Sequence, residues 1–262
     1  MTSLKLLFSI ALMSFCYFAC QDEADNGFTP SEPTTTTSPG TNNGTNTADL
    51  PAVFQKFENI EDIYIDGEYV VIVSKNLPDH GSPYYETGSN LYEAYNGNNP
   101  DFRLNPNRIA EQSLTYRIPL NPEATNNNQA TPLGPIGISV NGISIFNQYA
   151  GPNEPLTREI NSFDQHNGHP QQTGSYHYHI EPFYLTDKNG SNSLIGFLLD
   201  GFPVYGPIED GRRVTNEDLD EFHGHFGVTA DYPEGIYHYH ITDEDPYING
   251  NGYFGTPGTV SR

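Results

Sequence analysis

The stretch Tyr-His-Tyr-His-Ile at residues 176–180 returns letter for letter at residues 237–241. Each copy follows an Asp-x-x-x-Gly-His element, which begins at Asp164 in the first copy and at Asp220 in the second. Eight of the nine histidines fall between residues 166 and 240, far more than even spreading along the chain would place there. A duplicated supersecondary unit is the simplest interpretation of this pattern.

The alternation of tyrosine and histidine predicts that each motif is a β-strand with its two histidines on one face. Successive side chains of a strand point to opposite faces, so His177 and His179 project together while the tyrosines project the other way. The histidine of the preceding Gly-His element can then supply a third imidazole. The candidate ligands are therefore three histidines from each copy: His169, His177 and His179 in the first, and His225, His238 and His240 in the second.

Three imidazoles with an open fourth position are typical of catalytic zinc, and imidazole also binds copper, iron and nickel. We therefore expect a transition metal, copper or zinc, as the cofactor and partner of these motifs. Asp164 and Asp220 are predicted to accept the second ring N–H of a ligand histidine and so to orient it. His166 and His223 lie outside the shared pattern and are secondary candidates. Ordinary imidazoles have a pKa near 6.5, which predicts that metal binding weakens from about pH 7 to pH 5.

The sequence leaves several alternatives open. We expect the two copies to share one cleft, although two independent sites fit the same spacing. The tyrosines can instead form a core face with the histidines in a structural role, which would favour a non-catalytic surface module that binds a glycan or a protein. Glu181 and Glu221 lie near the motifs in sequence but are interpreted as solvated charges. Whether the protein is an enzyme, and on which small molecule it would act, stays open.

The motifs resemble those of the YHYH-domain family of exported bacterial proteins. The resemblance rests on both Tyr-His-Tyr-His copies, on their Asp-x-x-x-Gly-His elements, and on the segments 137–147 and 199–207. It covers residues 130–255. Members of the family often carry cysteines near the Gly-His elements and in the C-terminal loop, where this chain has other residues, so the resemblance implies no thiolate ligand here.

The amino-terminal residues predict export and a lipid anchor. An apolar run follows Lys5, is too short to span a bilayer, and ends at Ala19-Cys20, which resembles the processing site of a bacterial lipoprotein. We expect a signal peptide at 1–19, acylation of Cys20, and a disordered Thr/Pro/Asn-rich tether at 20–50. The acidic residues after Cys20 resemble the surface-export signal of Bacteroidetes lipoproteins. The predicted location is the cell envelope, at the outer membrane or the cell surface.

The composition favours a mainly β domain at 51–262. The formal net charge of −22 excludes nucleic acid as a partner, because phosphate backbones need clustered Lys and Arg. The 25 Gly and 21 Pro residues favour short strands and long loops over a helical bundle. One short helix is predicted to open at Thr215 and to end near Gly224. Strands are predicted at 63–65, 69–73, 114–120, 136–146 around an Asn-Gly turn, 176–180, 194–199 and 236–241.

Overall fold

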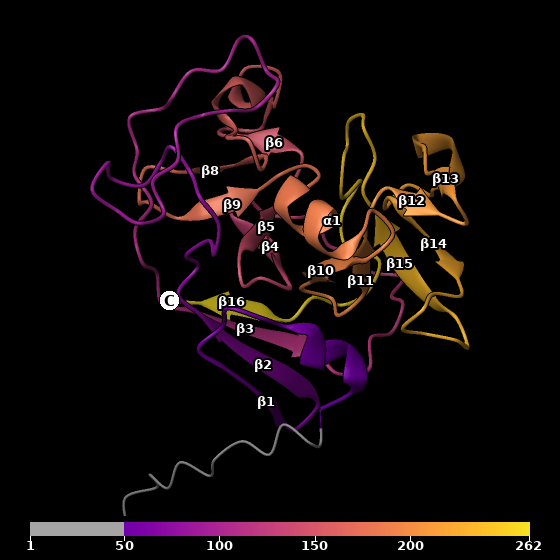
Figure 1. Ribbon diagram of the computed structural model, residues 1–262. Helices are drawn as coiled ribbons and strands as arrows, with labels where there is room; N and C mark the ends of the chain where they lie inside the picture. The colour runs from indigo at the N-terminus through magenta and orange to yellow at the C-terminus, as the bar shows by residue number, and fades with distance from the viewer. Residues whose placement is uncertain (1–49) are drawn as a thin grey trace, which may run out of the picture. The chain divides into compact units, whose positions relative to one another are not determined.

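Short β-strands joined by long loops make up most of the structure, a computed structural model that describes residues 50–262 (Figure 1). The mainly β class predicted from the sequence is confirmed. The predicted signal peptide at 1–19, the acylation site Cys20 and nearly all of the predicted tether at 20–50 lie outside the described residues. Between residues 50 and 262, no helix has the length and apolar composition needed to cross a membrane.

The smaller of the two main sheets has four strands in the order β1-β2-β3-β16. They are β1 (Asp62–Asp66), β2 (Tyr69–Ser74), β3 (Leu114–Pro119) and β16 (Thr259–Ser261). The predicted hairpin at 63–73 is confirmed, because β1 pairs with β2 and Gly67 takes the positive φ of 62° that a tight turn requires. Val70, Ile72 and Tyr116 are buried in one hydrophobic cluster with residues of the larger sheet.

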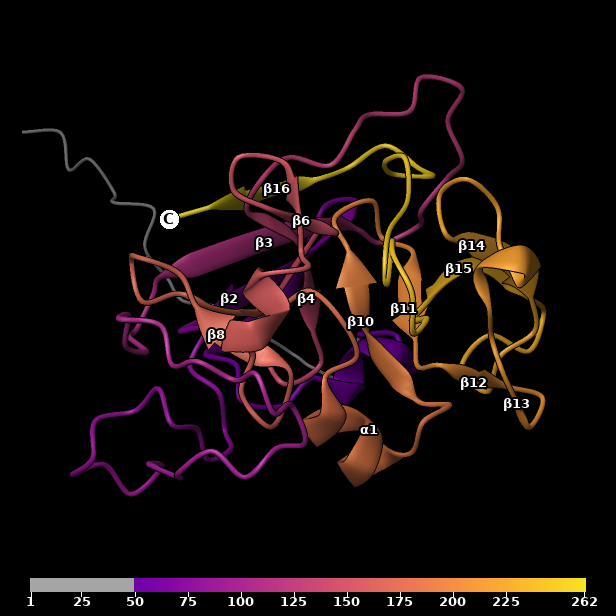
Figure 2. The same ribbon diagram turned by 90° about the horizontal axis from the view of Figure 1, so that it is seen from above.

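The larger sheet has eight strands in the order β14-β15-β11-β10-β4-β5-β9-β8, with β8 and β14 towards opposite ends (Figure 2). Its strands are β4 (Pro135–Ser139), β5 (Ser144–Phe146), β8 (Gly168–Pro170), β9 (Tyr176–Tyr178), β10 (Leu194–Leu198), β11 (Pro203–Tyr205), β14 (Gly224–Gly227) and β15 (Ile236–His240). Two small ribbons pair β6 (Tyr149–Ala150) with β7 (Glu154–Pro155) and β12 (Ile208–Glu209) with β13 (Arg212–Arg213).

The two halves of this sheet have the same pairing pattern. In the first half, β4 and β5 are antiparallel, β5 and β9 are parallel, and β9 and β8 are antiparallel. In the second half, β10 and β11, β11 and β15, and β15 and β14 repeat these relations in the same order. The duplication seen in the motifs therefore extends to a unit of four strands.

The halves meet where β4 pairs antiparallel with β10, with Ile138 opposite Phe197. Each of these strands carries an Ile-Gly pair four residues ahead of its Asn-Gly or Asp-Gly turn, at Gly137 in β4 and at Gly196 in β10. A β-carbon on Gly137 would collide with the carbonyl oxygen of Phe197, and one on Gly196 with that of Ile138. Glycine at both positions permits the close central pairing.

The helix predicted from Thr215 to Gly224 is wrong. The Thr215 and Asp218 side chains form the expected capping box, but it caps only a 3-10 turn at Asn216–Asp218. The chain leaves the helical path because the Asp220 carboxylate accepts the N–H groups of Phe222 and Gly224, an alternative to the helical bonds. The α-helix that the described residues contain is α1 (Phe183–Asn189), which the sequence analysis did not predict.

Asn76 connects the end of β2 to two strands of the larger sheet. Its side-chain oxygen accepts the backbone N–H of Ser144 at 2.7 Å, and its amide donates to the carbonyl of Tyr176 at 2.7 Å. Asn76 is buried and has a φ of 53°, which asparagine tolerates better than most residues.

Replacing Asn76 with alanine is expected to lower the free energy of unfolding by about 2–4 kcal/mol, because buried groups on β5 and β9 lose their partners. Chemical denaturation measures the loss. Asn76→Gly keeps access to the positive φ, so it should also be strongly destabilising if the side-chain bonds matter. A near-native stability of Asn76→Gly would assign the role to the backbone instead.

Candidate metal centres

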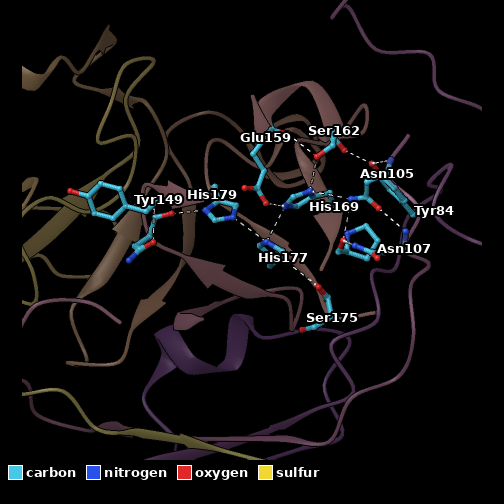
Figure 3. A network of polar contacts seen from close by, with 12 residues as sticks. Tyr84, Asn105, Asn107, Tyr149, Glu159, Ser162, His169, Ser175, His177 and His179 are labelled. Carbon is cyan, nitrogen blue, oxygen red and sulfur yellow. Dashed lines mark hydrogen bonds and ion pairs between the residues drawn. The ribbon is translucent and has the colours of Figure 1, made fainter. Parts of the chain in front are cut away.

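Four side chains from the first half of the larger sheet converge on one point, which we call cluster 1: Glu159, His169, His177 and His179. Nε2 of His177 lies 3.0 Å from Nε2 of His169 and 3.0 Å from Nε2 of His179 (Figure 3). An Oε1 of Glu159 lies 3.3 Å from Nε2 of His169. All three imidazoles are buried.

Strand register brings the three histidines together. His169 on β8 lies directly opposite His177 on β9, and His179 follows two residues later on the same face. Tyr176 and Tyr178 point to the other face and are fully buried there. The predicted alternation therefore builds the cluster, and His169 joins it from the neighbouring strand β8.

Hydrogen bonds at the outer nitrogens determine which ring nitrogen carries the proton. Nδ1 of His177 faces the carbonyl of Ser175 at 3.0 Å, and Nδ1 of His179 faces the carbonyl of Asn147. Nδ1 of His169 lies 2.8 Å from the Ser162 hydroxyl, whose own proton goes to the carbonyl of Glu159. A carbonyl accepts only, so these Nδ1 atoms are the donors and each Nε2 presents a lone pair. Three lone pairs and a carboxylate thus face one another.

The second half of the sheet builds an equivalent group, cluster 2: Glu209, His225, His238 and His240. His225 on β14 lies opposite His238 on β15, and their Nε2 atoms are 3.2 Å apart. Glu209 approaches all three rings, with carboxylate oxygens 3.2 Å from His225, 3.3 Å from His238 and 3.7 Å from His240.

The same proton assignment applies to two rings of cluster 2. Nδ1 of His238 faces the carbonyl of Ile236, and Nδ1 of His240 faces that of Gly206, both at 3.0 Å. Their Nε2 lone pairs therefore point toward a carboxylate. Nε2 of His240 is buried and has no hydrogen-bond partner. A buried acceptor without a donor is costly unless a cation completes the site.

Burial favours the neutral form of five cluster imidazoles, those of His169, His177, His179, His238 and His240. Loss of solvation lowers the pKa of His179 and of His240 to about 4, and it lowers the pKa of His238 as well. Burial, and then the neighbouring histidines, hold the pKa values of His169 and His177 well below 6.5. Protons therefore do not fill the space between the lone pairs at neutral pH, and the acceptors stay available to a metal ion.

The donor sets fit a first-row transition metal. Four ligands at Zn–N distances of 2.0–2.1 Å around a tetrahedron lie roughly 3.3 Å from one another. The nitrogen contacts within the clusters, at 3.0–3.2 Å, are within a few tenths of that value. Imidazole and carboxylate together suit zinc and copper better than calcium, which prefers six or more oxygens.

The expectation of one shared cleft is wrong, because the histidines separate into two groups. Cluster 1 lies on β8 and β9, whereas cluster 2 lies on β14 and β15, at the other edge of the sheet. Four strands stand between β9 and β15. In each half, the connection between the two parallel strands places the Tyr-His-Tyr-His strand farther from the central β4–β10 pair than its neighbour. The ligands of the two halves therefore lie far apart.

The expected role of Asp164 and Asp220 is also wrong, since neither carboxylate contacts a ligand imidazole in the described structure. Asp164 accepts the Tyr176 hydroxyl at 2.9 Å and two backbone N–H groups of its own turn. Asp220 does the same with the Tyr237 hydroxyl at 2.8 Å. The aspartates thus bind tyrosine hydroxyls on the opposite face of each motif, while backbone carbonyls orient most of the histidines.

The secondary candidates lie outside both clusters. His166 packs its ring 4.3 Å from that of His80, and Nε2 of His223 bonds the Thr242 hydroxyl at 3.0 Å. Glu159 and Glu209 were not predicted from the sequence. Neither is part of the repeated pattern: Glu159 belongs to a 3-10 turn at Glu159–Ser162, whereas Glu209 ends β12. In sequence, each glutamate lies between the β-hairpin of its half and the Tyr-His-Tyr-His motif that follows. This shared position is the signal that could have identified them.

Comparison with known proteins gives one match. Residues 115–214 and 208–252 match the model of a family described as YHYH protein. No curated protein and no solved structure matches the chain. The matched residues include both clusters and span more than half of the chain.

Proposed function

The chain belongs to the YHYH protein family, and we propose that in this member each cluster binds one transition-metal ion, zinc or copper, through three imidazoles and a carboxylate. The observation that carries the proposal is the convergence of Nε2 lone pairs, because neutral acceptors 3.0 Å apart repel one another unless a cation lies between them. The nitrogen contacts of 3.0–3.2 Å approach the ligand spacing of tetrahedral zinc, while copper ranks higher in general affinity.

Elemental analysis tests the proposal directly. Protein purified without a nickel column is expected to retain up to two ions of zinc or copper per chain. After removal of metal with a chelator, titration should restore two equivalents of zinc but none of calcium or magnesium. Calcium uptake without transition-metal uptake would contradict the proposal.

The lowered histidine pKa values move the pH range in which metal is lost. Free imidazoles would release metal from about pH 7 to pH 5, but His179 and His240 have pKa values of about 4 in the folded protein. Protons therefore compete with the metal of cluster 1, whose three imidazoles are all buried, only at lower pH, and the affinity of this cluster is expected to change by less than roughly tenfold between pH 7 and 5.5. It should fall steeply toward pH 4. Equilibrium dialysis measures the profile, and a decline that begins at pH 6.5 would mean that solvent-exposed imidazoles hold the ion.

We also propose that the protein is exported and anchored in the cell envelope through acylated Cys20. The support is the apolar run that ends at Ala19-Cys20 and the polar tether that follows. Cys20→Ala should accumulate as unprocessed precursor without lipid label. Normal labelling of this variant would rule out the anchor.

A further inference from the structure

Cluster 2 borders a pocket of about 130 Å³. His238, His240 and Glu209 form one side of it, and the loop after β14, including Val228 and Ala230, forms another. By the volume of liquid water the pocket has room for roughly four water molecules, or for one five-membered ring. The unpartnered Nε2 belongs to His240, which is 2% exposed and is part of this pocket wall.

The corresponding space in cluster 1 is filled by aromatic rings. Phe146 stacks on His177 with ring centroids 3.9 Å apart, and Phe163 packs 4.8 Å from His169 and 5.7 Å from His179. The side chain of His169 is only 3% exposed. Cluster 1 is therefore enclosed by apolar groups on the side where cluster 2 is open.

One substitution between the repeats accounts for part of this difference. Phe146 ends β5 and Tyr205 ends β11, at equivalent places beside the two motifs. Tyr205 meets His238 edge-on at 5.4 Å, and its hydroxyl is held away by Thr229 at 2.9 Å and by Asp231 at 3.0 Å. The Tyr205 ring therefore does not stack on the histidines as Phe146 does, and it lines the pocket instead. The side chain of His225 is 27% exposed, nine times the value at His169.

We propose that the metal ion of cluster 2 takes an additional small, uncharged nitrogen- or oxygen-donor ligand from this pocket, whereas cluster 1 holds its ion in a closed, structural site. The inference rests on the proposed metal binding. Both clusters offer four protein ligands, so the additional ligand at cluster 2 would make its ion five-coordinate, as catalytic zinc can become, whereas cluster 1 would keep the four-coordinate arrangement of a structural site. The metal ion would offset the charge of its ligand Glu209, and the second lining carboxylate, Asp210, disfavours anionic ligands.

Imidazole titration of the cobalt-substituted protein tests the inference, because the visible bands of Co²⁺ report each change in its ligands. Elemental analysis first counts the cobalt. Imidazole is expected to shift about half of the cobalt absorbance of the wild-type protein and to leave both ions bound. Azide, of similar size but negatively charged, should bind more weakly.

Ala230→Trp places a bulky ring at a pocket residue that is not a metal ligand, and it should weaken imidazole binding by at least roughly tenfold while both cobalt ions stay bound. Ala94→Trp makes the same change at an exposed position and should leave the titration unaltered. A variant that retains only cluster 1, His238→Ala with His240→Ala, should show no response to imidazole.

The outcomes separate the two proposals. Failure to bind cobalt removes the proposed function and this inference with it. If both ions bind, three results would overturn the inference alone. They are the absence of an imidazole response, a response from the cluster 1 ion, and undiminished imidazole binding in Ala230→Trp.

Discussion

Replacing His238 and His240 together with alanine is expected to reduce the bound metal from two ions per chain to one and to leave the remaining ion at unchanged affinity. The two clusters share no ligand. Strands β9 and β15 are five strand spacings apart, roughly 24 Å at 4.8 Å per spacing. Sites at such a distance without common partners behave additively. Elemental analysis and chelator competition measure the stoichiometry and the affinity.

The matched change in cluster 1, His177→Ala with His179→Ala, should remove the other ion. His223→Ala is the control, since this buried histidine bonds Thr242 and belongs to neither cluster. It should retain two ions. Loss of both ions from either double variant would contradict independent sites and would indicate that one metal supports the fold around the other.

Asp164→Ala is expected to lower the free energy of unfolding by about 3–5 kcal/mol, and Asp220→Ala by only about 1–2 kcal/mol. Asp164 is 2% exposed and accepts the hydroxyls of Ser82 at 2.6 Å and Tyr176 at 2.9 Å, which would be left buried without a partner. Asp220 lies at the surface, where water can replace it.

Denaturation of the metal-free proteins compares the two aspartates without interference from bound ions. Asp164→Asn keeps an acceptor and should give an intermediate loss. If Asp164→Ala and Asp220→Ala lower the free energy of unfolding equally, the loss comes from the turn that each aspartate stabilises and not from the buried hydroxyls.

Local sequence signals predicted β1–β5, β9, β10 and β15, but they missed the other strands, including β8 and β14 of the larger sheet, and they did not predict the non-local strand pairing. The hairpins at Asp66-Gly67 and Asn141-Gly142 follow from turn chemistry, because those dipeptides adopt the required backbone angles. The parallel pairing of β5 with β9 joins segments separated by a long connection, and nothing in either strand specifies its partner. Helix α1 was missed because it begins after Pro182 with Phe183 and has no side-chain cap.

The candidate site, too, was predicted from the sequence only in part. The histidines were identified because strand alternation fixes the face on which they lie, and register then brought His169 opposite His177. The carboxylates Glu159 and Glu209 were missed because they reach the clusters from connecting segments whose paths depend on tertiary packing. The number of sites was also wrong, since the order of strands in the sheet, and not the motif, sets the separation of the clusters.

The register of the central β4–β10 pair has a consequence for the symmetry of the chain. Ile138 lies opposite Phe197, its counterpart in the other repeat, and the flanking pairs Ser139↔Gly196 and Gly137↔Leu198 are the same pair read in opposite directions. This is the isologous contact that two identical subunits form across a two-fold axis. The chain therefore has the internal symmetry of a dimer within one polypeptide, and its two candidate metal centres differ in the ring beside their histidines, phenylalanine in one and tyrosine in the other.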